Sequence, residues 1–289
     1  MFRTLALSIL GTLWLLCGVS AATILVVPGP GTPVQDAIDA AAPGDTIKLA
    51  GGSYAESVTI TKPLRLVGPS HTWLSGEPQP AAIVPGCGGS TTGVTVAADH
   101  VTIRDLRVAS FTDYGIDVTG RNRVSVRNVL VAPNCGNDAP LASINVEGST
   151  HVKVEQGWVS GFADDDGPAL RLKSIPAGGK VRVHRIFAGR HAIGFLVEDC
   201  APGSVTLSAN SANFNFATGI LARNADGILL KKNVVSENPV SGIELDTTSE
   251  GNRLVANAIS GSATDVIDAG TGNCWKNNTF NTGSVPPCP

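Results

Sequence analysis

The sequence is poor in charge and in the large side chains that fill ordinary globular cores. It has one Met, four Trp, two Tyr and eight Phe in 289 residues, and charged residues make up 16% of the chain, against about a quarter in a typical domain. The formal net charge of −3 predicts no cationic field able to hold nucleic acid or an anionic membrane surface. Hydrophobic residues still reach 43%, so we expect a folded protein with a core of small branched side chains.

Long hydrophobic runs are absent beyond the N-terminus. The chain opens with a basic residue, an apolar run from Leu5 to Cys17 and small residues up to Ala21. The run is shorter than the roughly 20 residues that a membrane span needs, and the pattern is typical of a signal peptide cleaved after Ala21. We therefore expect residues 1–21 to be removed, leaving a secreted protein, extracellular or periplasmic, with no membrane span and one domain over residues 22–289.

The cysteine pattern excludes the common zinc sites, because the chain has no CxxC pair and no Cys/His spacing that suggests zinc. Five cysteines follow the expected leader, an odd number for an exported protein. Cys274 and Cys288 lie close together around the Pro/Gly-rich tail, and Cys87 and Cys135 both lie in Gly/Asn-rich connecting segments. We predict a disulfide within each pair, which leaves Cys200 as the free thiol.

Short apolar-x-apolar units recur along the chain at intervals of 22 to 28 residues. They begin at Val94, Ile116, Ile144, Leu170, Phe195, Ile220, Ile243 and Val266. A second unit follows most of them within about ten residues, beginning at Val101, Val124, Val152, Val181, Val205 and Ile228. Gly, Asn and Asp separate the units, so each repeat is predicted to hold at least two short strands of period two joined by tight turns.

Two solenoids have a repeat of this length, the leucine-rich horseshoe and the parallel β-helix. A horseshoe needs a Leu-dense frame and a helical segment in each repeat, whereas the inward residues here are mostly Val and Ile and no repeat has a helical apolar period. The sequence therefore predicts an all-β fold, a single-stranded parallel β-helix solenoid. Each repeat forms one rung, and like residues stacked rung on rung fill the narrow interior.

Both ends of the solenoid are expected to be capped, because repeat arrays must protect their terminal rungs from edge pairing. Thr32 is the expected N-cap of a short helix that runs to Ala42 and stops at the following Pro-Gly pair. A strand over residues 46–49 follows it, so residues 22–60 form the N-terminal cap with the first strands. Residues 275–289 form the C-terminal cap.

A column of asparagines is predicted in the C-terminal rungs. Four of them occupy one slot, three residues after the last inward apolar residue of the second strand: Asn210, Asn233, Asn257 and Asn278. Earlier rungs have Val129, Gly157 and Ile186 in this slot. Stacked side-chain amides can hydrogen-bond along the axis, so we expect an Asn ladder that covers only the later half of the solenoid.

These features together resemble a known superfamily. The opening VQDAIDAAAPGDTIKLAGGSYAESVTITKPLRLVG, the GI.V...V.V repeats and the Asn ladder are similar to the right-handed parallel β-helix proteins of the pectate-lyase-like superfamily, over nearly all of the mature chain. The resemblance implies a right-handed solenoid. It does not fix an activity, because the superfamily includes lyases, polygalacturonases, methylesterases, uronan epimerases, phage tailspikes and non-enzymatic surface proteins.

No catalytic motif of these enzymes is intact in the chain. The QDT and GxxDFIFG-type segments of pectin methylesterases are missing, as are the NTD and RIK motifs of polygalacturonases. The YGxDPHD motif of uronan epimerases is matched only over its first four positions, Tyr114 to Asp117, and then breaks. The resemblance therefore transfers no catalytic residue to this sequence.

A polar wall is predicted on one outer face of the middle rungs. Outward residues at equal offsets stack at about 4.8 Å per rung, which makes neighbours of Asp117, Asn145 and Arg171. The longest loops lead into this face, and loops on a rigid scaffold often carry function. They include Tyr114, Asp138, Asp164, Asp165, Asp166, Arg190 and His191. We expect Tyr114, Asn145, Lys173 and Arg190 to contact a substrate there.

Two kinds of chemistry are open to this wall. A uronate lyase needs a base and a cation that neutralises the substrate carboxylate; Asp164 and Asp166 are candidate Ca²⁺ ligands, Arg171 is the partner for the carboxylate, and His191 or Lys173 is the base. A hydrolase needs two carboxylates, for which the candidates are Asp117 with Asp138 or with Asp165.

Structural roles compete with each of these assignments. Asp164 to Asp166 followed by Gly is the composition of a solvated turn, and His191 suits a residue that packs a loop. Residues two positions further along the same strands alternate in sign over Glu147, Lys173, Glu198, Arg223 and Asp246, which predicts an ion-pair ladder that contributes little stability per exposed pair.

Three classes of function remain after these comparisons. The first is a secreted β-helix protein that engages an extracellular polysaccharide, with lyase, epimerase or hydrolase activity on uronate-containing glycans and Ca²⁺ as a candidate cofactor. The second is a non-catalytic surface, scaffold or adhesion protein, because no catalytic motif is intact. The third, a metal-handling periplasmic β-helix, is disfavoured by the shortage of clustered His, Met and Cys.

Overall fold

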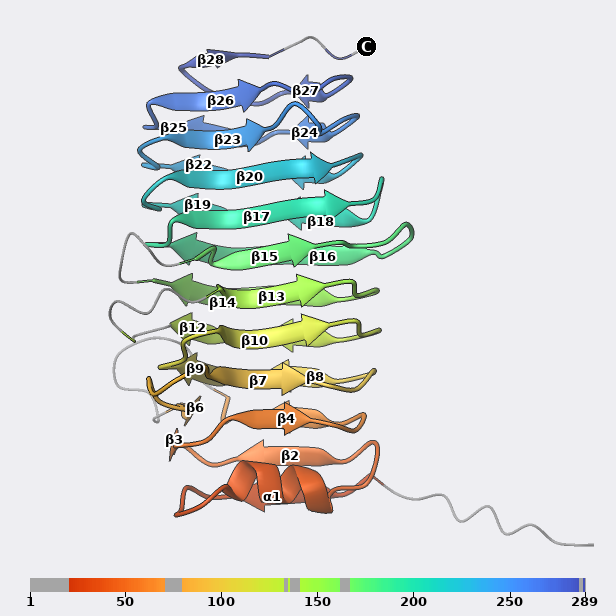
Figure 1. The fold of residues 1–289 in the computed structure, drawn as a ribbon, viewed down its shortest axis with the longest axis vertical. Coiled ribbons are helices and arrows are strands. Elements are labelled where there is room, and N and C mark those ends of the chain that lie inside the picture. The colour runs from red at the N-terminus through yellow and green to blue at the C-terminus, as the bar shows by residue number, and fades with distance from the viewer. Residues whose placement is uncertain are drawn as a thin grey trace, which may run out of the picture.

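The computed structural model describes residues 21–70, 80–132, 135, 141–161, 167–285 and 288. The chain winds into a right-handed parallel β-helix of about 10 turns, with one short helix, α1 (Pro33–Ala40), across its N-terminal end. Figure 1 shows the rungs stacked along one long axis, from α1 at the bottom to β28 at the top. The all-β solenoid predicted from the repeats is confirmed. The described part of the chain contains no helix long and apolar enough to cross a membrane.

Sheet B is formed by one strand from each rung and has ten strands in parallel. From bottom to top they are β4 (Val58–Ile60), β7 (Thr92–Val96), β10 (Tyr114–Thr119), β13 (Ala142–Glu147), β15 (Leu170–Lys173), β17 (Ile193–Cys200), β20 (Thr218–Ala225), β23 (Ser241–Leu245), β26 (Thr264–Asp268) and β28 (Gly283–Ser284). These strands contain the first apolar unit of each repeat.

Sheet A has 18 strands in two columns. The first column holds β1 (Thr23–Val26), β2 (Thr46–Leu49), β5 (Arg65–Val67), β8 (Thr102–Arg104), β11 (Ser125–Arg127), β14 (Lys153–Ser160), β16 (Val181–Gly189), β18 (Val205–Ser208), β21 (Leu229–Lys231), β24 (Arg253–Val255) and β27 (Cys274–Lys276). The second column holds β3 (Gly52–Tyr54), β6 (Ala81–Ile83), β9 (Leu106–Ala109), β12 (Leu130–Ala132), β19 (Ser211–Asn213), β22 (Val234–Ser236) and β25 (Ala258–Ser260). The long strands β14 and β16 run through both columns and join them.

The core is a set of apolar columns that run along the axis. In sheet B, Ile116 is in register with Val94 below it and Ile144 above it, followed by Leu170 and Phe195, and all five side chains are fully buried. The second column of sheet A supplies a third inward strand per rung. The two apolar units of each repeat account for the other two strands and did not locate this one. Because each residue packs on its equivalents above and below, Val and Ile fill the interior without large aromatics.

Side chains from the first rungs bind both ends of the helix α1. The predicted helix is confirmed over Pro33–Ala40, but Thr32 makes no side-chain capping bond to the backbone. Instead the buried carboxylate of Glu56 accepts hydrogen bonds from the amides of Val34 and Gln35, both at 2.9 Å. A carboxylate is favourable at this positive end of a helix. At the other end Lys62 Nζ donates to the carbonyl of Ala41 at 2.9 Å.

The predicted Asn ladder is confirmed in the upper rungs. The Nδ2 group of Asn210 donates to Oδ1 of Asn233 at 3.1 Å, Asn233 donates to Asn257 at 3.0 Å, and Asn257 donates to Asn278 at 2.9 Å. A second amide column lies at the next bend of the chain and joins Asn215 to Asn238 at 3.0 Å. The interior of the upper half therefore contains directional polar columns as well as apolar ones.

The cysteine prediction is confirmed as well. Cys87 is bonded to Cys135 across 48 residues, and Cys274 is bonded to Cys288 across 14. Cys200 is the free cysteine and is buried at the end of β17, where burial raises the pKa of its thiol to about 11. A thiol with so high a pKa is a poor nucleophile at neutral pH, so Cys200 acts here as a packing residue.

Candidate functional site

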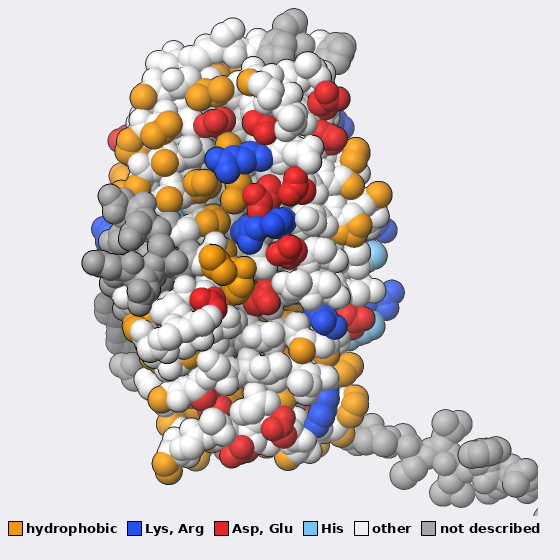
Figure 2. Space-filling view, viewed as in Figure 1, with side chains coloured by type: hydrophobic (Ala, Val, Ile, Leu, Met, Phe, Trp, Pro, Cys, Tyr) orange, Lys and Arg blue, Asp and Glu red, His pale blue; other side chains and the backbone are white. Residues whose placement is uncertain are grey.

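The outer face of sheet B carries the predicted polar wall. Register pairs place Asp117, Asn145 and Arg171 side by side on β10, β13 and β15, as the repeat spacing predicts. Two positions further along the same strands, Thr119, Glu147, Lys173 and Glu198 form a second row. Figure 2 shows acidic and basic side chains following one another up this face. Because the strands are parallel and in register, residues far apart in sequence line one continuous surface.

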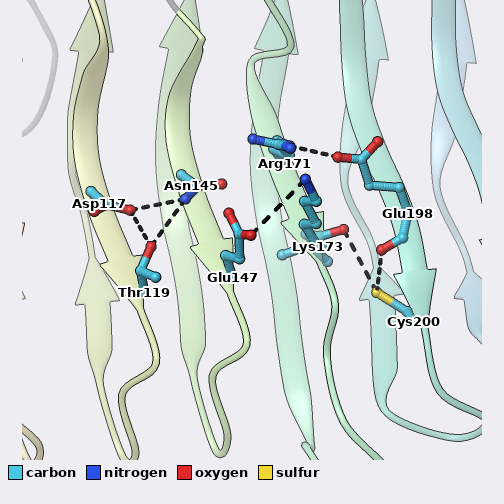
Figure 3. A network of polar contacts seen from close by, with 9 residues as sticks. Asp117, Thr119, Asn145, Glu147, Arg171, Lys173, Glu198 and Cys200 are labelled. Atoms are coloured by element: carbon cyan, nitrogen blue, oxygen red, sulfur yellow. Dashed lines mark hydrogen bonds and ion pairs between the residues drawn. The ribbon is translucent and has the colours of Figure 1, made fainter.

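The lower part of the wall is a hydrogen-bonded group centred on Asn145. Its Nδ2 donates to Oδ1 of Asp117 at 2.9 Å and to Oγ1 of Thr119 at 3.3 Å. The Thr119 hydroxyl also donates to the same Asp117 oxygen at 2.8 Å. The Asp117 carboxylate is therefore held in one orientation by two donors, as Figure 3 shows.

Asn145 also has an acceptor without a partner. The side chain is 1% exposed, and its Oδ1 makes no hydrogen bond to any described residue. In Figure 3 this oxygen points away from Asp117, toward the strand that bears Arg171. Burying an unpaired carbonyl oxygen costs about 1–3 kcal/mol, so a water molecule or a ligand donor is expected to satisfy it.

The upper part of the wall is built on two ion pairs. Arg171 Nε donates to Oε1 of Glu198 at 2.7 Å, with both side chains less than one-fifth exposed. Lys173 Nζ lies 4.0 Å from Oε1 of Glu147, with both side chains about one-third exposed. Burial works to lower the pKa of Arg171, but the hydrogen bond and charge of Glu198 outweigh it and hold the pKa above its ordinary value. Arg171 is therefore cationic at every physiological pH.

The predicted alternating ladder forms only in part. Glu147 pairs with Lys173, but Glu198 turns to Arg171 in the neighbouring row rather than to Lys173 or Arg223. Asp246 is occupied by the hydroxyls of Thr248 and Ser249, at 2.9 and 2.8 Å. Among the described residues the ladder is thus interrupted at Glu198, whose carboxylate is engaged by Arg171.

Tyr114 lies at the start of β10, beside the charged part of the wall. Burial raises the pKa of its phenol; the charge of Arg171 opposes this shift, whereas the charges of Asp117, Glu147 and Asp113 add to it. The phenol thus senses both rows and remains protonated at neutral pH. Tyr114 therefore presents a hydroxyl and a half-buried ring next to Arg171.

His191 does not reach the wall. It is fully buried, its Nδ1 is 3.1 Å from the carbonyl oxygen of Gly167, and its Nε2 is 3.5 Å from Oγ of Ser143. Burial lowers its pKa to about 4, so the imidazole is neutral at pH 7. A base must touch the proton that it removes, and a side chain enclosed in this way suits the packing role.

The other predicted site residues are placed as follows. Arg190 is exposed at the bend after β16, with a left-handed φ of 58°. Asp138, Asp164, Asp165 and Asp166 lie outside the described residues, so the Ca²⁺ ligands and the second carboxylate of a hydrolase stay predictions. Within the described ranges no group of three or more His, Cys, Asp or Glu side chains is arranged to hold a metal ion.

The wall also contains Glu198, Glu147 and Thr119, which were not predicted as site residues. The sequence did contain a signal for them, because they occupy the same offset in successive repeats as Lys173. What the offset did not reveal is the diagonal bond from Arg171 to Glu198. This bond depends on side-chain reach rather than on register.

Comparisons with known proteins agree with this architecture. Residues 184–286 match the model of the family described as periplasmic copper-binding protein (NosD). No curated protein matches the sequence. The matched segment covers the upper rungs, where Asn257 and its equivalents stack.

Solved structures with a similar fold extend over nearly the whole chain. The pectate lyase Pel9A superposes with a TM-score of 0.68 at 13% identity, covering 92% of this chain and 78% of that one. The A-module of the mannuronan C-5 epimerase AlgE4 of Azotobacter vinelandii gives 0.52 at 14% identity, covering 86% and 83%. PfbA, a surface adhesin of Streptococcus pneumoniae, gives 0.50 at 14% identity, covering 91% and 92%.

The donors in the matched segment do not suit copper. His184 Nδ1 is engaged with the carbonyl and hydroxyl oxygens of Ser208, at 3.0 and 3.1 Å. His191 is enclosed, Cys200 is buried, and Cys274 is in a disulfide. Copper sites are built from converging imidazole and sulfur ligands, which these described residues do not provide. The likenesses therefore show the fold, and the chain is a right-handed parallel β-helix of the pectate-lyase-like architecture.

Proposed function

We propose that this protein is exported and engages an extracellular polysaccharide containing uronate sugars through the outer face of sheet B. The observation that carries the proposal is Arg171, a largely buried guanidinium held by Glu198 on the same face as Tyr114, Asn145 and Lys173. A fixed guanidinium is well suited to bind carboxylates. Its contact with Glu198 uses Nε, so the two terminal nitrogens can face a ligand.

The dimensions of the wall support a chain-like ligand. Asp117, Asn145, Arg171 and Glu198 lie on four successive strands, β10, β13, β15 and β17. At about 4.8 Å per strand they span roughly 15 Å, which is enough for a few sugar units. The cations Arg171 and Lys173 suit the acid groups of such a ligand, while the Asp117 carboxylate suits its hydroxyl groups.

Two observations favour binding without turnover as the alternative, that of a non-catalytic surface or adhesion protein. His191 is buried and neutral, so it does not serve as a base in this arrangement, and the other candidate base, Lys173, lies beside the carboxylate of Glu147. The predicted Ca²⁺ ligands and the second carboxylate of a hydrolase are at positions 138 and 164–166. Similarity of fold to the pectate lyase, the epimerase and the adhesin is compatible with either outcome.

One experiment tests the proposed binding and separates turnover from the non-catalytic alternative. Purified mature protein is titrated calorimetrically with oligogalacturonate, oligomannuronate and a neutral glucan, with and without Ca²⁺. In the same samples, absorbance at 235 nm reports unsaturated uronate ends and a reducing-sugar assay reports hydrolysis. We expect binding to a uronate oligomer that falls at least about ten-fold in Arg171→Ala, the loss of one charge-assisted contact.

The matched control is Arg223→Ala, which removes the same charge from an exposed position of the same face on β20. We expect Arg223→Ala to bind like the parent. Equal binding by Arg171→Ala and the parent, or no binding to any uronate oligomer, would refute the proposal. A signal at 235 nm would assign a lyase, new reducing ends without it a hydrolase, and binding without either signal the non-catalytic alternative.

A further inference from the structure

The outward side chains of the first column of sheet A are almost all basic or neutral. We define the basic face as the Lys and Arg residues that point outward from these strands or from the bends that follow them. They are Lys48, Arg65, Arg104, Arg127, Lys153, Arg182, Arg185, Lys231, Lys232, Arg253 and Lys276, all exposed. These eleven are more than half of the 21 Lys and Arg residues of the chain, so a chain of net negative charge concentrates its cations on one face.

Two directly paired positions of the basic face carry like charges, whereas Arg127 is also in register with Glu155 on the next strand. Arg104 lies beside Arg127, and Lys153 lies beside Arg182, on adjacent strands about 4.8 Å apart. Among the outward residues on the described strands of this column, one is acidic, the half-buried Glu155. Arg104 pairs with the neighbouring Asp105, and the other ten basic residues form no ion pair with any described residue.

This arrangement differs from that of the wall on sheet B, where acidic and basic residues neutralise one another. Like charges on directly paired positions of neighbouring strands destabilise a sheet, and a purely structural surface would alternate them. Cations recur along most of the solenoid, with neutral residues such as Thr206 and Ser208 between them. Such a surface is complementary to a linear polymer with spaced negative charges.

We propose that the basic face is a second binding surface, which takes a linear polyuronate along the solenoid axis. The inference shares with the proposed function the expectation of a uronate-containing glycan, but it concerns different residues on a different sheet. Recognition there is electrostatic, with a cation of Arg127, Lys153, Arg182 or Arg185 opposite successive carboxylates. Contacts of this kind hold a polymer while a few sugars occupy the site around Arg171.

An anionic membrane fits this surface less well. Peripheral membrane sites combine basic residues with exposed apolar side chains that enter the lipid. Among the described outward positions of the first column, the exposed large hydrophobic residue is Leu25 of β1, beside Lys48 at the lower end. Trp158 and Val234, which are 45% and 48% exposed, belong to the second column. Charge spread over many rungs with an apolar side chain at one end alone favours a soluble polyanion.

Two matched triple variants test the inference. The first, Arg127→Ala/Lys153→Ala/Arg182→Ala, removes three charges from the basic face. The second, Arg171→Ala/Lys173→Ala/Arg223→Ala, removes three charges from sheet B. The affinity of each variant for polygalacturonate is measured by biolayer interferometry across a salt series, with dextran, phosphatidylglycerol vesicles and duplex DNA as comparison ligands. Far-ultraviolet circular dichroism and thermal unfolding check that both variants are folded.

We expect the basic-face variant to lose at least about ten-fold in affinity at low salt, the sum of three modest charge contacts. Its plot of log affinity against log salt should flatten by about 2 units, by analogy with the release of condensed counterions from other polyanions. Parent-like affinity and salt dependence in the basic-face variant, with loss in the sheet B variant alone, would overturn this inference and leave the proposed function standing.

The remaining outcomes are also decisive. Loss in the basic-face variant alone would support this inference and count against the site at Arg171. If neither variant changes, both are wrong. Tighter binding of the parent to the vesicles or to DNA than to polygalacturonate, at equal charge concentration, would show that the basic face serves a lipid surface or a nucleic acid instead.

Discussion

The lower and upper halves of the solenoid keep their rungs in register by different interactions. In the rungs of β7 to β16, the bend between the two columns of sheet A is filled by Val129 and Ile186, which are buried. In the rungs of β18 to β27, the same slot holds Asn233 and its equivalents, each bonded to the next. In Figure 1 the turns between the upper rungs are short and evenly spaced.

The difference shows what each kind of column can tolerate. An apolar column is stabilised by area removed from water, so it accepts Val, Ile or Gly in one slot and a rung with an inserted loop. An amide column depends on direction, because each Asn both donates to one neighbour and accepts from another. A single wrong residue leaves several buried groups unpaired, which explains why the regular rungs and the Asn columns occur together.

The largest expected change in stability follows from the loss of one central Asn side chain of the ladder. Asn233→Ala removes the acceptor for the amide and the Nδ2 group of Asn210, and the donor to the carbonyl of Leu207. With about 1–3 kcal/mol for each buried unpaired group, and partial relaxation, we expect the free energy of unfolding to fall by about 4 kcal/mol. Urea unfolding followed by circular dichroism measures this change.

The matched control for the ladder is Val129→Ala, in the same slot of the lower half. It deletes two buried methyl groups and should reduce the free energy of unfolding by about 2 kcal/mol. If Val129→Ala proves as harmful as Asn233→Ala, the two columns do not differ in the way that their contacts indicate.

The next effect concerns His191, which lies at the lower end of the second amide column. Its backbone amide donates to Oδ1 of Asn215 at 3.4 Å, so it occupies the slot that Asn215 and Asn238 occupy above. Burial lowers the pKa of its imidazole from 6.5 to about 4. The unfolded chain therefore binds a proton before the folded chain does, and acid destabilises the fold.

The pH dependence follows from this difference in pKa. The stabilisation of the neutral form is fully present above about pH 6.5 and is lost as the pH falls to about 4, a change of about 3 kcal/mol. Urea midpoints measured between pH 7 and pH 4 report it. His191→Asn continues the amide column with a group that does not titrate, so its stability should fall less steeply over this range. Parallel curves for the parent and His191→Asn would contradict the assignment.

The fold was predictable from the sequence because every rung repeats one local pattern. The spacing of Val94, Ile116 and Ile144 sets the register of sheet B directly, and the equal offsets of Asn210 and Asn233 set the ladder. A solenoid converts sequence offset into spatial neighbourhood, so the row of Asp117, Asn145 and Arg171 also followed from counting.

The details of the site were less predictable, because they depend on side-chain reach and on enclosure. No offset indicates that Arg171 bonds diagonally to Glu198, or that His191 points into the interior rather than toward the wall. The net charge of −3 predicted no cationic field, since composition averages over all faces. The register of Lys153 with Arg182 shows that the cations are gathered on one face.

The smallest expected effect is the difference in coupling free energy between the two ion pairs of the wall. Double-mutant cycles on Arg171 with Glu198 and on Lys173 with Glu147, each with Ala and Gln replacements, measure the coupling in the free energy of unfolding. The first pair is short and largely shielded from solvent, so we expect a coupling of about 1 kcal/mol, whereas the second is longer and more exposed and should contribute about 0.3 kcal/mol. Raising the salt concentration to 1 M should remove most of the second coupling and less of the first. A larger coupling for Lys173 with Glu147 would mean that Arg171 is not held by Glu198 in solution, and the proposed carboxylate site would lose its fixed cation.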